Sequence, residues 1–143
     1  MTKYGKIDGI WFDGLGLAPG TWDTPEMLKM LRTLNPDLIF NHRFGRPAMR
    51  LGDFDGPENR IGRFQTNRPW ETCYCIGGPW GYSKKATPLS KKDAIQLLIR
   101  CAGNGGNLLL NTGPLPDGSI HPEDVATLRE VGRRLRAGEE PSS

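Results

Sequence analysis

Short β-prone segments alternate with amphipathic helical patterns along this 143-residue chain. Strands joined through helices form parallel βαβ units, so the alternation predicts an α/β fold with about four parallel strands and three helices. Four such strands suit an open sheet or half of an eight-stranded barrel, because a complete (β/α)8 barrel needs about 250 residues. The predicted strands span residues 7–13, 37–41, 71–76 and 107–111, and the predicted helices span 24–34, 91–102 and 122–137.

The helix ends carry recognisable signals. Thr24, as the capping residue before Pro25, predicts the start of the first helix, and Ser90 predicts the cap of the second. A left-handed glycine is the usual residue just past a helix, so Gly138 predicts the end of the third helix and residues 139–143 a frayed tail. The run of leucines at residues 108–110 is typical of a parallel strand buried on both faces.

Polar residues cluster where the predicted strands end. They include Asp13, residues 41–43, residues 80–82 and Asn111. The carboxyl ends of parallel strands are where sheets and barrels of this class place their sites. An irregular stretch from Phe44 to Pro69 separates the second and third strands, and loops of this length are often functional.

Composition excludes several classes of function. The net charge is only +3 and the basic residues are scattered apart from the arginine-rich last helix, whose arginines fit a solvated face, so we expect no nucleic-acid partner. There is no transmembrane run or lipidation motif, and no set of residues with metal-ligand spacing. Three cysteines cannot all pair within the chain, and their expected role is that of small buried hydrophobic residues; they are Cys73, Cys75 and Cys101.

Asp13 is the most informative single residue. It ends a run of β-prone residues and stands two positions after Trp11, although a carboxylate before Gly14 also fits an ordinary turn. Further carboxylates and aromatic residues follow in the long loop and at strand ends. Acids and an arginine bind sugar hydroxyls, aromatic rings stack on sugar C–H faces, and glycoside hydrolysis needs two carboxyl groups. The additional residues are Asp53, Asp55, Glu58, Trp70, Trp80 and Tyr82.

Six motifs in order make the chain resemble the α-L-fucosidase family of retaining glycoside hydrolases from about Lys6 to Gly138. They are Ile-Asp-Gly-Ile-Trp-Phe-Asp-Gly, Asn-His-Arg-Phe-Gly, Gly-Asp-Phe-Asp-Gly-Pro-Glu, Pro-Trp-Glu-Thr-Cys, Trp-Gly-Tyr and Gly-Asn-Gly-Gly-Asn-Leu-Leu-Leu-Asn-Thr-Gly-Pro-Leu-Pro-Asp-Gly-Ser-Ile. The resemblance implies hydrolysis of terminal α-L-fucosyl residues by double displacement, with no cofactor and no metal. It also implies a fucosylated glycan as substrate, no membrane partner, and a secreted, periplasmic or lysosomal location.

The resemblance assigns catalytic or fucose-binding roles to five residues and a supporting role to two more. Asp13 matches the nucleophile and Glu58 the acid/base, with Asp53 and Asp55 as alternatives to Glu58. Trp11, Arg43 and Trp80 match residues that bind fucose, whereas Trp70 and Glu71 match a pair with a supporting role. The sequence departs from the family pattern in three places: His42 stands where the family usually has Asp or another small polar residue, Gly56 replaces a Thr, and the loop at residues 15–20 lacks the Gly-Trp often seen after the nucleophile.

The resemblance also implies that the upstream barrel half is missing. We expect residues 1–138 to form the C-terminal half of a partial (β/α)8 TIM-like barrel and 139–143 a disordered tail. The missing N-terminal half would then be supplied in the same longer chain, or two copies of the short chain would pair. The rival hypothesis is an inactive truncated half barrel that binds sugar weakly at most.

Overall fold

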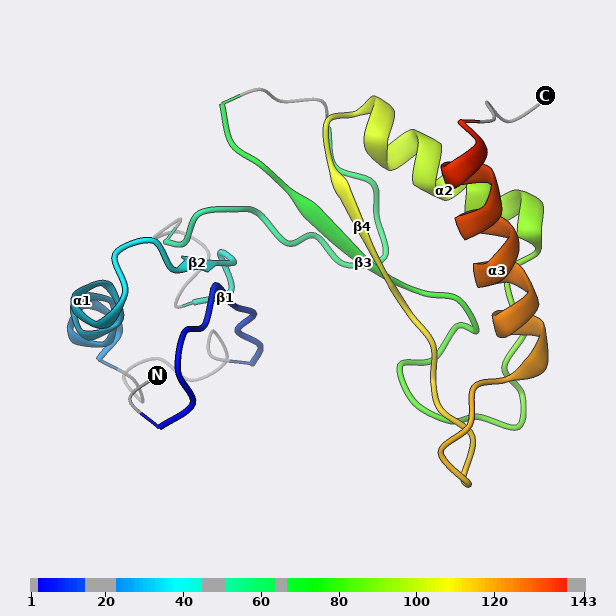
Figure 1. Cartoon of the computed structure of the whole chain (residues 1–143), viewed down its shortest axis with the longest axis horizontal. Coiled ribbons are helices and arrows are strands. Elements are labelled where there is room, and N and C mark those ends of the chain that lie inside the picture. Colours follow the sequence, from blue (N-terminus) through cyan, green and yellow to red (C-terminus); the bar gives the residue numbers. More distant parts are fainter. Residues whose placement is uncertain (1–2, 15–22, 45–50, 64–66, 139–143) are drawn as a thin grey trace. The chain divides into compact units, whose positions relative to one another are not determined.

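The computed structural model describes residues 3–14, 23–44, 51–63 and 67–138. Its element order agrees with the predicted alternation, including parallel strands (Figure 1). The predicted tail at 139–143 lies outside the described residues. No helix in the described ranges is both long enough and apolar enough to cross a bilayer. The elements are β1 (Gly9–Ile10), α1 (Thr24–Leu34), β2 (Ile39–Phe40), β3 (Glu71–Cys75), α2 (Lys91–Gly103), β4 (Asn107–Asn111) and α3 (Pro122–Ala137).

The chain divides into two compact units. The first comprises Met1–Gly56 and Thr66–Trp70, and the second comprises Pro57–Gln65 and Glu71–Ser143. Each unit contains one two-stranded parallel sheet: β1 pairs with β2 in the first, and β3 pairs with β4 in the second. The α/β class with parallel strands is therefore confirmed, whereas assembly into half of a barrel stays a prediction.

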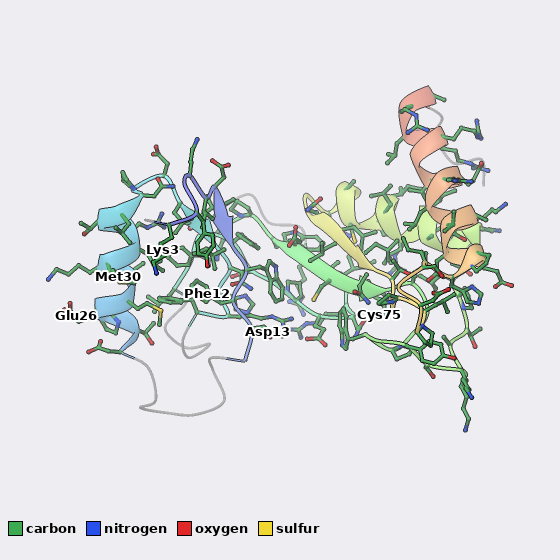
Figure 2. The ribbon with its side chains drawn as sticks, turned by 60° about the horizontal axis from the view of Figure 1, so that its bottom comes forward. Lys3, Phe12, Asp13, Glu26, Met30 and Cys75 are labelled. Atoms are coloured by element: carbon green, nitrogen blue, oxygen red, sulfur yellow. The ribbon has the colours of Figure 1, made fainter. Side chains whose placement is uncertain are left out.

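An aromatic and aliphatic cluster holds the first unit together. Leu31 of α1 and Phe40 of β2 are buried in it, and Phe12 packs against them from the segment after β1 (Figure 2). The rings of Phe12 and Phe44 lie 4.6 Å apart between centroids, and those of Phe40 and Phe44 lie 5.2 Å apart. These contacts fix the segment that follows β1, on which Trp11 and Asp13 stand.

The second unit is built on β3 and β4, which run side by side in Figure 1, with Glu71 opposite Asn107 and Cys75 opposite Asn111. Helices α2 and α3 pack against each other, and α2 also contacts β4. Ser90 caps α2 by accepting a hydrogen bond from the Asp93 amide, as predicted. All three cysteines are buried here and none is joined to another by a disulfide, which confirms their expected role.

Three predicted details were wrong. The cap of α1 is Asp23, whose side chain accepts from the Glu26 amide, so Thr24 is the first residue inside the helix. Strand β4 is not buried on both faces, because Leu109 is 45% exposed. The first two strands are also shorter than predicted, because β1 is Gly9–Ile10 instead of 7–13 and β2 is Ile39–Phe40 instead of 37–41.

The stretch predicted to be irregular contains parallel backbone pairing in its described part. Isolated parallel bridges join Asn41 to Phe54, Asp55 to Trp70 and Glu58 to Cys73. Gly52 makes the first of these possible, with φ at +86° and its Cα so close to β2 that an added Cβ would lie 2.4 Å from the Asn41 carbonyl oxygen. Only glycine fits such an approach at positive φ.

Candidate active site

The first unit brings Asp13 and Arg43 into direct contact. The Nη1 atom of Arg43 donates to Oδ1 of Asp13 at 3.1 Å. The Asp13 side chain is 73% exposed and that of Arg43 only 18%, so the cation is the fixed partner and the carboxylate stays open to a ligand. Asp13 stands just beyond β1 and Arg43 just beyond β2, as expected for the carboxyl ends of two neighbouring parallel strands.

The side chain of Asn41 aligns these two strand ends. Its Oδ1 accepts from the Phe12 amide and its Nδ2 donates to the Phe12 carbonyl, both at 2.9 Å. Asn41 is fully buried, and its amide group thus acts as a backbone-like partner that extends the β1–β2 pairing past Ile10. Sequence reasoning noted Asn41 only as a polar strand end and missed this role, because both partner atoms belong to Phe12, 29 residues away in the sequence.

Arg43 has two further supports. Its Nε and Nη2 donate to the carbonyl oxygen of Gly56 at 3.2 and 3.1 Å. The guanidinium carbon also lies 4.7 Å from the centroid of a Trp11 ring, within the range of a cation–π contact. Three of the five predicted site residues, Trp11, Asp13 and Arg43, therefore meet in this unit.

Asp53 and Asp55, the alternatives to Glu58, are each engaged with an arginine. Asp53 accepts from Arg32 at 2.6 Å and from the Phe40 amide at 2.9 Å. Asp55 accepts from Nε of Arg68 at 2.7 Å. Both carboxylates hold the loop to neighbouring segments, an arrangement that favours a structural role for them over proton transfer.

Glu58 belongs to the second unit, where its segment pairs with β3. The Cys73 amide donates to the Pro57 carbonyl at 3.2 Å, and the Asn59 amide donates to the Cys73 carbonyl at 2.9 Å. This pairing fixes the backbone on both sides of Glu58, and the Glu58 side chain is exposed. A carboxylate on a fixed backbone with an exposed side chain has the access that a proton donor needs.

Trp80 follows β3 and is 43% exposed. The Nδ2 atom of Asn111, the last residue of β4, donates to the Trp80 carbonyl at 3.0 Å. At the opposite end of the same strand pair, Asn107 donates to a carboxylate oxygen of Glu71 at 2.6 Å. Glu71 thus links β3 to β4 through a side-chain hydrogen bond, which fits the supporting role expected for it. Trp80, in contrast, is exposed at a strand end.

A small hollow, partly open to solvent, lies beside the Trp80 loop. Gly113 closes it against Gly81: an added Cβ on Gly113 would lie 2.6 Å from the Gly81 carbonyl oxygen. Asp124 lines the hollow and is 3% exposed; one of its oxygens accepts from the Thr112 hydroxyl at 2.7 Å and the other has no hydrogen-bond partner. Within the described ranges, no group of three acidic, His or Cys side chains is placed to hold a metal ion.

Comparison with known proteins agrees with this architecture. The sequence model of the α-L-fucosidase family matches residues 1–140. The chain is 30% identical to the tissue α-L-fucosidase of Rattus norvegicus over 146 residues, which cover 95% of this chain and 31% of that enzyme. It thus spans about a third of the length of the curated relatives that it matches.

Solved structures give the same result. The α-L-fucosidase isoenzyme 1 of Paenibacillus thiaminolyticus superposes with a TM-score of 0.82 at 32% identity, over 95% of this chain and 36% of that one. An α-L-fucosidase of Bacteroides thetaiotaomicron, trapped as a covalent intermediate with 2-fluoro-fucosyl fluoride, gives a TM-score of 0.78 at 25% identity, over 96% of this chain and 37% of that one. From the match across nearly all of its residues, we conclude that the chain belongs to the α-L-fucosidase family.

Proposed function

We propose that this chain supplies the nucleophile-bearing part of a retaining α-L-fucosidase that removes terminal fucosyl residues from glycans. The observation that carries the proposal is the contact between an exposed carboxylate, Asp13, and a fixed guanidinium, Arg43, beside Trp11. A trapped covalent intermediate in the Bacteroides relative supports a covalent route. We further propose that both parallel strand pairs belong to one half of a (β/α)8 barrel.

In the proposed reaction, the Asp13 carboxylate attacks the anomeric carbon while Glu58 gives a proton to the leaving oxygen. Water then attacks the fucosyl–Asp13 ester, and Glu58 takes up the proton of that water. Arg43 and Trp11 would bind the sugar next to Asp13, and Trp80 would pack on its apolar face. The remaining sugar-binding residues would come from the part of the catalytic domain that the matched enzymes have beyond this third of their length.

The test is a chimera in which this chain replaces the matching segment of the Paenibacillus enzyme. We expect hydrolysis of 4-nitrophenyl α-L-fucoside, and a fucosyl adduct on Asp13 after treatment with 2-fluoro-fucosyl fluoride, located by mass spectrometry of peptides. Asp13→Asn should lower turnover by at least about a thousandfold, because the nucleophile would be lost. Asp53→Asn is the matched control, since Asp53 binds Arg32 and the Phe40 amide.

Two outcomes would argue against the proposal. A folded chimera that forms no adduct and hydrolyses nothing would favour the inactive half barrel. An active chimera in which Asp13→Asn leaves turnover unchanged would refute the nucleophile assignment while keeping the activity. The isolated chain, titrated with fucose in parallel, shows whether this third of the domain binds sugar alone.

A further inference from the structure

Two consecutive residues, His42 and Arg43, hold the backbone of Gly56 from both sides. The Gly56 amide donates to Nδ1 of His42 at 2.7 Å, and the Gly56 carbonyl accepts from Nε and Nη2 of Arg43. The His42 amide itself donates to the Phe54 carbonyl at 2.8 Å, so the histidine backbone is anchored to the same segment. Gly56 is therefore fixed by one side chain at its N–H and by the next at its C=O.

The contact at Nδ1 defines the form of the His42 ring. An atom that accepts an N–H hydrogen bond carries no proton, so the neutral imidazole must hold its proton on Nε2. An imidazolium ring has two donors and no acceptor, and cannot make this bond. The geometry thus requires one tautomer of one charge state.

Packing around Gly56 reinforces the arrangement. Gly56 is buried, and a Cβ placed on it would lie 3.6 Å from the His42 ring and 3.7 Å from the Trp11 ring. These are ordinary contact distances, so a methyl group fits between the rings and a branched side chain meets both. The absence of a side chain at position 56 and the ring of His42 are thus complementary in size.

The chain of contacts continues to the nucleophile candidate. Since Arg43 uses Nε and Nη2 on Gly56, its remaining terminal nitrogen, Nη1, points to Asp13 at 3.1 Å. A displacement of Gly56 would move the acceptor that sets the plane of the guanidinium. The route from His42 through Gly56 and Arg43 to Asp13 consists of three successive hydrogen-bonded contacts, all within the first unit.

We propose that His42, as the neutral Nε2-protonated tautomer, is a positioning residue that fixes Gly56 and through it the orientation of Arg43 toward Asp13. The catalytic meaning of this role rests on the proposed function. The geometry itself does not depend on that function, and NMR of the chain can measure it directly.

The test uses nitrogen-15 NMR of the labelled chain at pH 8, above the ordinary histidine pKa of about 6.5. We expect the Nδ1 signal of His42 to be that of an unprotonated ring nitrogen coupled across the hydrogen bond to the Gly56 amide. His121→Gln identifies the signals, because His121 is the second histidine of the chain and its Nδ1 also accepts an amide, that of Glu123.

A pair of variants then tests the link to Arg43. His42→Ala removes the acceptor, whereas His42→Asn restores one near the position of Nδ1. In His42→Ala, we expect the Arg43 Nε proton to exchange with solvent about tenfold faster, which corresponds to the loss of one ordinary hydrogen bond. In His42→Asn, we expect the exchange rate to return to within about threefold of the wild-type rate. Far-UV circular dichroism checks that both variants fold.

Three results would overturn the inference: a protonated Nδ1 at pH 8, no coupling to the Gly56 amide, or equal Arg43 exchange in the wild-type chain and His42→Ala. If His42→Ala does not fold, the tautomer and the coupling in the wild-type chain still decide. Failure of the chimera to hydrolyse fucoside leaves these signals unaffected, so the two proposals fail separately.

Discussion

A substitution at Gly52 tests whether the backbone before the 53–56 segment lies directly against the carbonyl groups of Phe40 and Asn41. Its φ is +86°, and a Cβ at this position would lie 2.4 Å from the Asn41 carbonyl oxygen and 2.8 Å from that of Phe40. Gly52→Ala incurs two costs. The left-handed conformation costs a residue with a Cβ about 1–2 kcal/mol. Relief of the overlap by backbone movement adds about 1–3 kcal/mol, as in other overpacked sites.

Gly5 supplies the matched control in the same unit. Its φ is +75°, and nothing lies within 4 Å of a Cβ built on it, so Gly5→Ala carries only the conformational cost of about 1–2 kcal/mol. We therefore expect Gly52→Ala to lose about 2–5 kcal/mol, a clearly larger loss. Urea titrations followed by tryptophan fluorescence and circular dichroism give both free energies of unfolding. Equal losses would refute the reasoning, because they would mean that the loop does not lie against Asn41.

Three further predictions concern the second unit. Burial raises the pKa of the Cys75 and Cys101 thiols, so a thiol reagent at pH 8 should label neither in the native chain and both after unfolding in urea. Hydrogen bonds from Arg133 and Arg134 lower the pKa of Glu130 to about 2 from 4.5, so this carboxylate stabilises α3 above about pH 4.5, and its contribution should fade between pH 4.5 and 2; thermal melts of wild type and Glu130→Gln should differ at pH 6 and converge near pH 2. Thr112→Val removes the donor to the buried Asp124 carboxylate and should cost about 1–3 kcal/mol in urea titration, more than Thr33→Val, whose hydroxyl bonds the Lys29 carbonyl on an exposed helix face.

Local signals predicted the three helices and the strands β3 and β4 well, whereas β1 and β2 are much shorter than their predicted ranges. The bounds of β4, the Ser90 cap and the Gly138 stop depend on a few neighbouring residues, and the structure has all three. Local signals could not decide between Asp23 and Thr24 as the cap of α1, because the two residues are adjacent and both types of side chain are good caps. The prediction that β4 is buried on both faces was also wrong, because an apolar run in a strand does not specify which other elements pack against it.

The tertiary contacts of the site were less accessible. The segment 53–58 lacks an apolar alternation, so the sequence gives no sign that it pairs with residues at 41, 70 and 73. The side chain of Asn41 replaces a backbone partner, and no local pattern distinguishes that use from a polar strand end. Family resemblance singled out Asp13 and Arg43, and only the structure shows that Arg43 bonds the carbonyl of Gly56 and that His42 bonds its amide.

The contacts that hold Arg43 determine where its positive charge lies when the charge on Asp13 changes. Formation of the proposed ester would remove the negative charge from that carboxylate, and with it the ion pair. The guanidinium nevertheless keeps its two hydrogen bonds to Gly56 and its position over Trp11, neither of which depends on Asp13. Its positive charge would then stay in place throughout both steps of a reaction, while the anion beside it is consumed and regenerated.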